Sequence, residues 1–131
     1  MTESGLSLKH ETLPSGVTYI VAEGQLDANT SGQLDEMVGA ITTGGSHRII
    51  VDLEQVTYIS SSGVGVFVGF VNSCREQGGD IVLIYPWGME GKQGEVGLSS
   101  GYNALEVFNL LGLTDFFKVV NDKAQAEAAF E

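Results

Sequence analysis

The sequence predicts an α/β fold, in which one domain combines a mostly parallel or mixed sheet of about five strands with about four helices. Short runs rich in β-branched residues alternate along the chain with longer segments whose apolar residues recur at helical spacing. Strands that alternate with helices need crossover connections, and these favour parallel pairing. The chain has 131 residues, 43% of them apolar, which is enough to bury one core.

The first third of the chain predicts two strands and a helix. Residues 6–8 alternate as a short first strand would, and residues 17–22 are apolar on both faces, as a central strand would be. Thr30 and Gln33 have the spacing of a capping box, in which each side chain satisfies a backbone donor of the other residue. They predict the start of a helix. Its apolar face comprises Leu34, Met37, Val38 and Ile41.

The middle of the chain predicts a strand, a helix and another strand. Residues 48–53 form an apolar run, and three serines follow at positions 60–62. The valines of the next segment fit a strand or a helix, but its length up to the glycines at 78–79 favours a helix. Residues 81–85 predict a buried strand. The serines therefore lie at a strand-to-helix junction, where free backbone N–H groups favour negative charge.

The last part of the chain predicts two helices, a short strand and an unusual loop. Residues 104–111 predict a helix, residues 116–120 an edge strand and residues 122–130 a final alanine-rich helix. Residues 86–101 form a glycine-rich loop, which is either a flexible excursion or a functional one. Parallel strands end at the same edge of a sheet, so this loop would leave from the edge that carries the serines. Trp87 would then offer an apolar contact to a partner.

Composition excludes several classes of function. The chain has 17 acidic and 6 basic residues, a net charge of −11, which suits neither nucleic acid nor an anionic membrane surface. No apolar run approaches the roughly 20 residues of a membrane span, so we expect no membrane insertion. Residues 1–4 do not resemble a signal peptide, and we expect a cytoplasmic protein. Cys74 is the only cysteine, so no disulfide within the chain is possible, and its place on the inward face of the second predicted helix predicts a small core residue.

An enzymatic role is not predicted. The hydrolase motif Gly-x-Ser-x-Gly would need a glycine where Ile59 stands. The only possible histidine bases are His47, expected at the opposite end of the sheet, and His10, near the end of the first strand. Asp52 lies at the predicted end of a strand and suits a structural or solvated role. No cofactor or metal site is expected.

Four short segments and the order of elements together resemble the anti-sigma-factor antagonists of the STAS domain family. The segments are residues 24–27 (Gly-Gln-Leu-Asp), the strand end at residues 52–53 (Asp-Leu), residues 59–65 (Ile-Ser-Ser-Ser-Gly-Val-Gly) and residues 111–113 (Leu-Gly-Leu). The resemblance extends over about residues 5–130. It implies a single STAS-like domain over residues 1–131, with the glycine-rich loop at 86–101 as an insertion.

The resemblance implies a phosphorylation switch. The unmodified antagonist would bind an anti-sigma serine kinase, which supplies ATP, and phosphorylation would release it until a serine phosphatase restored it. The acceptor by position is Ser61. Ser60, which stands where the family usually has aspartate, is its competitor. The alternative is an unphosphorylated scaffold, or a partner subunit of a signalling assembly or a transport complex. The expected partner-binding residues are Asp27, Ser60, Ser61, Ser62, Gly63 and Trp87.

Several residues of this predicted site also have a purely structural interpretation. Ser61 is explained equally well as a helix cap, and Ser62 as a cap or first-turn residue. Gly63 and Gly65 would admit either a partner backbone or close packing of helix on sheet. Asp27 would either shape the partner surface or hydrogen-bond the turn before the first helix.

Overall fold

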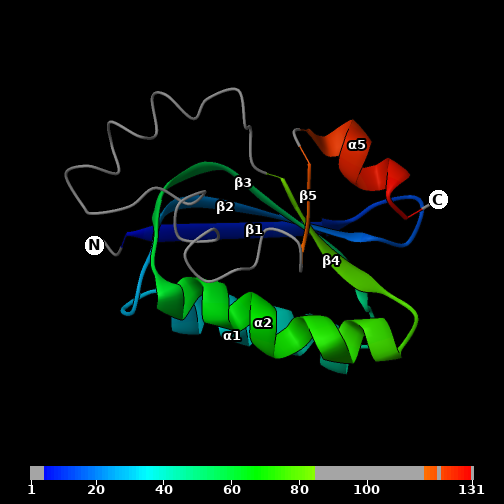
Figure 1. Cartoon of the computed structure of the whole chain (residues 1–131), viewed down its shortest axis with the longest axis horizontal. Coiled ribbons are helices and arrows are strands. Elements are labelled where there is room, and N and C mark those ends of the chain that lie inside the picture. The colour runs from blue at the N-terminus through cyan, green and yellow to red at the C-terminus, as the bar shows by residue number, and fades with distance from the viewer. Residues whose placement is uncertain (1–4, 85–116, 121, 131) are drawn as a thin grey trace.

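The computed structural model describes residues 5–84, 117–120 and 122–130, and within them five strands and three helices form one α/β unit (Figure 1). The strands lie in the sheet in chain order, with β1 antiparallel to β2 and the others parallel. The predicted helix at 104–111 and the loop at 86–101 lie outside the described residues. The elements are β1 (Leu6–Thr12), β2 (Thr18–Leu26), α1 (Ser31–Thr43), β3 (Arg48–Ile59), α2 (Ser61–Glu76), β4 (Asp80–Ile84), β5 (Lys118–Val120) and α5 (Lys123–Ala128).

The sheet separates two layers of helix. α1 and α2 lie together on one face, and α5 lies on the other (Figure 1). Each parallel connection between β2, β3 and β4 runs through one of the first two helices, as the alternation of elements predicted. The larger part of the core therefore lies between the sheet and the α1–α2 layer.

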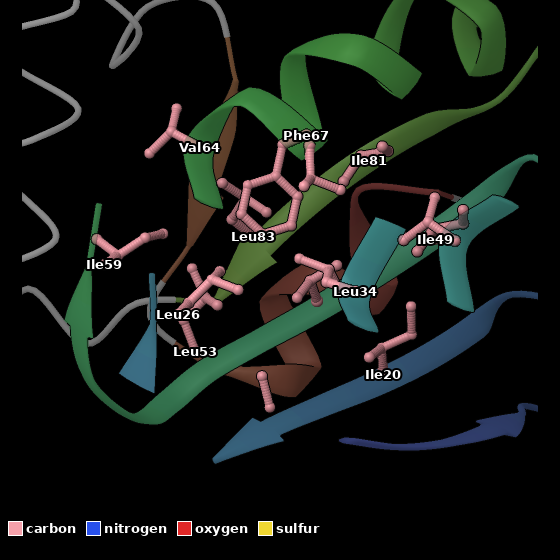
Figure 2. Packing of buried hydrophobic residues seen from close by; sticks show 14 of the residues in the cluster. Ile20, Leu26, Leu34, Ile49, Leu53, Ile59, Val64, Phe67, Ile81 and Leu83 are labelled. Carbon is pink, nitrogen blue, oxygen red and sulfur yellow. The ribbon is translucent and has the colours of Figure 1, made fainter. Parts of the chain in front are cut away.

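The core follows the alternation of side chains along the strands. Ile20 and Leu26 of β2 point toward the α1–α2 layer, where they meet Leu34 of α1 (Figure 2). Phe67 of α2 is fully buried and packs edge-on against Phe117, with ring centroids 6.3 Å apart. Cys74 is buried in the same layer, which confirms its prediction as a core residue.

Three strands are longer than the sequence predicted. β1 extends to Thr12, β2 to Leu26 and β3 to Ile59, so Asp52 lies within β3 and not at its end. The extensions contain polar side chains that interrupt the hydrophobic pattern, so the sequence did not predict them. The pairing of β2 with β3 also contains two register shifts. The irregular stretch includes Gly24, whose φ of 109° and whose contact with the Gly5 carbonyl oxygen leave no room for a side chain.

The predicted capping box at Thr30 and Gln33 is wrong. Thr30 is the N-cap of α1, but its side chain makes no capping hydrogen bond. Its ψ of −15° is already helical, whereas a capping hydroxyl needs an extended residue. The hydroxyl instead donates to the Gln25 carbonyl oxygen at 2.8 Å and accepts from the Asp27 N–H at 2.9 Å. Thr30 thus ties the start of α1 back to the end of β2.

A polar cluster occupies the α5 face of the sheet. The Tyr19 hydroxyl donates to Asp52 at 2.5 Å, and the Asp52 carboxylate also accepts from the Glu54 N–H at 2.9 Å. Burial raises the pKa of Tyr19, and its hydrogen bond to Asp52 raises it further. The Lys123 Nζ lies 4.5 Å from the centre of the Tyr19 ring. Asp52, only 6% exposed, is therefore a hydrogen-bonded structural carboxylate.

Removing the Tyr19 hydroxyl should destabilise the fold. Tyr19→Phe leaves the buried Asp52 carboxylate without one donor, so we expect the free energy of unfolding to fall by about 1.5–3 kcal/mol. Urea denaturation measures it. Tyr58→Phe is the matched control, because the half-buried Tyr58 has no hydrogen bond from its hydroxyl within the described part of the chain, and it should change stability by less than about 0.5 kcal/mol. Equal losses in the two variants would contradict the role given to Asp52.

Candidate functional site

The start of α2 is built by Ser60. Its backbone is extended (φ −103°, ψ 171°), and its Oγ accepts a hydrogen bond from the Gly63 N–H at 3.3 Å. The Ser60 N–H donates to the Leu26 carbonyl oxygen at 2.9 Å, which joins this turn to the end of β2. Ser60 is therefore the cap, whereas the sequence had offered Ser61 or Ser62. Ser61 is the first residue of the helix, and the exposed Ser62 follows in the first turn.

The two glycines after the serines have different environments. Gly63 is buried, and a Cβ built on it would lie 2.6 Å from the Leu26 Cγ. Close packing of helix on sheet therefore accounts for Gly63. Gly65 is exposed, and a Cβ there would meet no atom within 4 Å. Since glycine weakens a helix by roughly 0.5–1 kcal/mol relative to alanine, intramolecular packing does not account for Gly65.

Asp27 forms the turn between β2 and α1. Its Oδ1 accepts from the Asn29 N–H at 2.9 Å and from the Thr30 N–H at 3.1 Å. Its carbonyl oxygen also accepts from the Ser31 N–H at 2.8 Å. The structural interpretation of Asp27 is thus confirmed, and its contribution to a partner surface stays a prediction. The carboxylate is half-buried at the end of the sheet where α1 begins.

The N-terminal turns of α1 and α2 flank an open hollow of about 300 Å³. Both helices begin at the same end of the domain, beyond the ends of β2 and β3 (Figure 1). The partial positive charges of two helix N-termini are therefore close to one small surface. The hollow is lined by Ser31, Gly32 and Asp35 of α1 and by Ser62, Gly65 and Val66 of α2.

The residues that line this hollow include an acidic side chain and no basic one, which is unusual for an anion-binding site. Asp35 is the only ionisable residue among the six that line it. The two helix N-termini oppose that negative charge with their partial positive charge. A neutral serine side chain fits this balance, and an added dianion would meet Asp35 with no basic side chain among the lining residues.

The structure brings together most of the predicted site residues. Ser60, Ser62, Gly63 and Asp27 all lie at this end of the sheet, whereas Trp87 lies outside the described residues. The contribution of α1 was missed, namely Ser31, Gly32 and Asp35. Their signal was topological, because a helix that follows β2 must begin beside a helix that follows β3 when these strands are parallel and adjacent.

The two histidines do not provide a base at this site. The His47 carbonyl oxygen accepts from the Asp80 N–H, which places His47 before β3 and β4, at the opposite end of the sheet from the serines. His10 lies in β1 and borders a different hollow, which is lined also by α1 residues near its C-terminal end. The expected separation of His47 from Ser61 is therefore confirmed.

Comparison with known proteins gives a consistent result. Residues 12–89 match the family model of the STAS domain. An anti-sigma-B factor antagonist from Listeria monocytogenes is 28% identical over 102 residues, which cover 78% of this chain and 77% of the relative. The chain and this relative thus align over most of both lengths.

Solved structures share the fold. SpoIIAA in its unphosphorylated form superimposes with a TM-score of 0.62 at 20% identity and covers 94% of each chain. The phosphorylated form of the Bacillus SpoIIAA gives a TM-score of 0.61 at 21% identity, over 94% of this chain and 99% of that one. At this level of identity the likeness establishes the fold alone.

The two glycines should respond oppositely to alanine. Gly63→Ala should lower the free energy of unfolding by about 1–3 kcal/mol, because the new methyl group overpacks against Leu26. Gly65→Ala should raise it by about 0.5–1 kcal/mol, because a better helix former enters open space. Chemical denaturation of both variants provides the comparison. A stable Gly63→Ala protein would show that α2 does not need its close approach to β2.

Proposed function

We propose that this chain, which belongs to the STAS domain family, is an anti-sigma factor antagonist. In its unphosphorylated form it binds an anti-sigma serine kinase, which uses ATP to phosphorylate Ser61 and so ends the binding. A serine phosphatase restores the first state. The observation that carries the proposal is the position of Ser61 as the first residue of α2, next to a hollow flanked by two helix N-termini.

The relatives support the same role. The Listeria monocytogenes protein is named an anti-sigma-B factor antagonist, and SpoIIAA has been described in phosphorylated and unphosphorylated forms. Both forms of SpoIIAA superimpose on this chain almost equally well, with TM-scores of 0.61 and 0.62. A switch that leaves the fold in place agrees with these values.

Ser61 is a better acceptor than Ser60 on structural grounds. The Ser60 hydroxyl oxygen already accepts the Gly63 N–H as the cap of α2, and its backbone N–H is bonded to Leu26. Phosphorylation of Ser60 would place the ester on the atom that caps the helix. Ser61 is the first residue of α2, one position after the cap, which favours it as the acceptor.

The effect of the phosphate follows from the local charges. A phosphoserine carries about −1.5 to −2 charges at pH 7, and free N–H groups at the start of α2 can accommodate it within this domain. A partner surface that fits a neutral serine would instead bury a dianion, with Asp35 as the only ionisable residue lining the hollow. Such burial without a cation is costly, so the partner dissociates.

Open space over two glycines supports direct contact with a partner at the hollow. Neither Gly32 nor Gly65 would meet an atom within 4 Å if it carried a Cβ, and both line the hollow. A partner backbone can therefore approach closely between α1 and α2. The net charge of −11 favours a kinase with a neutral or basic docking surface.

The acceptor can be identified by tandem mass spectrometry. Incubation with a cognate anti-sigma kinase and ATP should add one phosphate, on Ser61. Ser61→Ala should abolish the modification, while Ser60→Ala should keep it, since a lost cap costs only about 0.5–2 kcal/mol of stability. Phosphate found only on Ser60 or Ser62 would overturn the assignment. No phosphate with any kinase encoded in the same genome would favour an unphosphorylated scaffold or a partner subunit of a transport complex.

Binding of the kinase should follow the charge at position 61. Ser61→Ala should bind constitutively, and Ser61→Asp should bind at least about tenfold more weakly, because a buried uncompensated carboxylate is costly. Ser73→Asp is the matched control, since Ser73 is exposed on α2 but remote from the hollow. Calorimetric titration gives the affinities. Equal affinities for the three folded variants would leave Ser61 with a structural role only.

A further inference from the structure

β1 forms one edge of the sheet, and its outer side has a regular set of backbone groups. The Gln25 N–H donates to the Gly5 carbonyl oxygen at 2.6 Å, and the Leu13 N–H donates to the Val17 carbonyl oxygen at 2.8 Å. Hydrogen-bonded pairs alternate along an antiparallel ladder, so odd-numbered residues of β1 bond to β2. The N–H and C=O groups that point away from β2 belong to Leu6, Leu8, His10 and Thr12.

We propose that two copies of this chain pair through their β1 edges in an antiparallel arrangement, which joins their sheets into one continuous sheet. The outward groups of Leu8, His10 and Thr12 on each copy would supply the new ladder. His10 would pair with His10 of the second copy, and Leu8 with its Thr12. A strand edge with unpaired N–H and C=O groups is a template for such pairing.

The charges of Lys9 and Glu11 favour this register over the two registers that are shifted by two residues. Lys9 and Glu11 are exposed, point to the same face of the sheet, and have no ion pair with another described residue. In the proposed register Lys9 of each copy lies opposite Glu11 of the other. This is a non-hydrogen-bonded pair, in which the two side chains are closer than in a hydrogen-bonded pair. A shift of two residues in one direction would oppose Lys9 to itself, and a shift in the other direction would oppose Glu11 to itself. Both alternatives bring like charges together.

The helix layer leaves room for a second copy. A hollow of about 400 Å³ lies between the end of β1 and α1, with His10 and Thr12 on the strand side and Met37 and Ile41 on the helix side. The α1 helix is thus set back from this end of the strand. None of the residues around Ser61 takes part in the pairing, so the inference is independent of the proposed function.

Sedimentation equilibrium of the full chain tests the proposal. At about 0.15 M salt the long-range repulsion of two acidic chains is screened. We expect a reversible monomer–dimer equilibrium. Lys9→Glu and Glu11→Lys should each weaken it by about tenfold, because each change replaces two attractive pairs with two repulsive ones. The double variant with both changes should restore it.

The two single changes alter the net charge in opposite directions, so a general charge effect cannot make both weaken the dimer. Far-ultraviolet circular dichroism verifies that each variant is folded. His10→Pro is a second variant, because proline removes an outward N–H and is tolerated on an edge strand; it should also weaken the dimer. A wild-type chain that stays monomeric at its highest soluble concentration would overturn the proposal. A dimer unaffected by Lys9→Glu, or one that the double variant fails to restore, would also overturn it.

Discussion

The packing of the first turn of α2 against the end of β2 sets the geometry of the candidate site. Gly63 has no side chain, and this lets the helix begin directly over Leu26. The carbonyl oxygen of Leu26 accepts the hydrogen bond from Ser60, the cap of the same helix. Since Leu26 is followed at once by the Asp27 turn, a single residue of β2 helps to position the starts of both α1 and α2.

At the surface formed by this arrangement, the charge of a bound group should matter more than its shape. The hollow between the helices is shallow and lined mainly by small side chains. The helix N-termini offset part of the negative charge of Asp35, the only ionisable residue among those that line the hollow. The proposed switch at this place needs no movement of the sheet or of the core, in which Phe67 is fully buried.

The sequence predicted the architecture well because the core-facing pattern is strong. The α/β class, the positions of β4 and α5, and the burial of Cys74 all follow from apolar spacing. The extension of β3 beyond Leu53 was missed because the exposed Glu54 and Gln55 interrupt the apolar run before the buried Val56 and Ile59. The pairing of β2 with that extension depends on register shifts, which only the folded sheet reveals.

The site was predictable in its location but not in its details. The sequence placed the three serines at a strand-to-helix junction. Identifying Ser60 as the cap of the helix required the backbone angles of the folded chain. Thr30 looked like a cap by spacing and instead bonds back to β2. Asp35 and Gly32 face the serine helix only because two helices start side by side, which is a property of the tertiary structure.

The buried thiol of Cys74 can serve as a chemical probe of how often α2 separates from the sheet. Cys74 lies in α2, the helix that begins with Ser61, and it is the only cysteine of the chain. Burial raises the pKa of its thiol, and the nearby Asp80 raises it further. A thiol reagent can therefore react only when α2 separates from the sheet. The rate of that reaction reports the free energy needed to separate α2, the helix of the proposed acceptor Ser61, from the sheet.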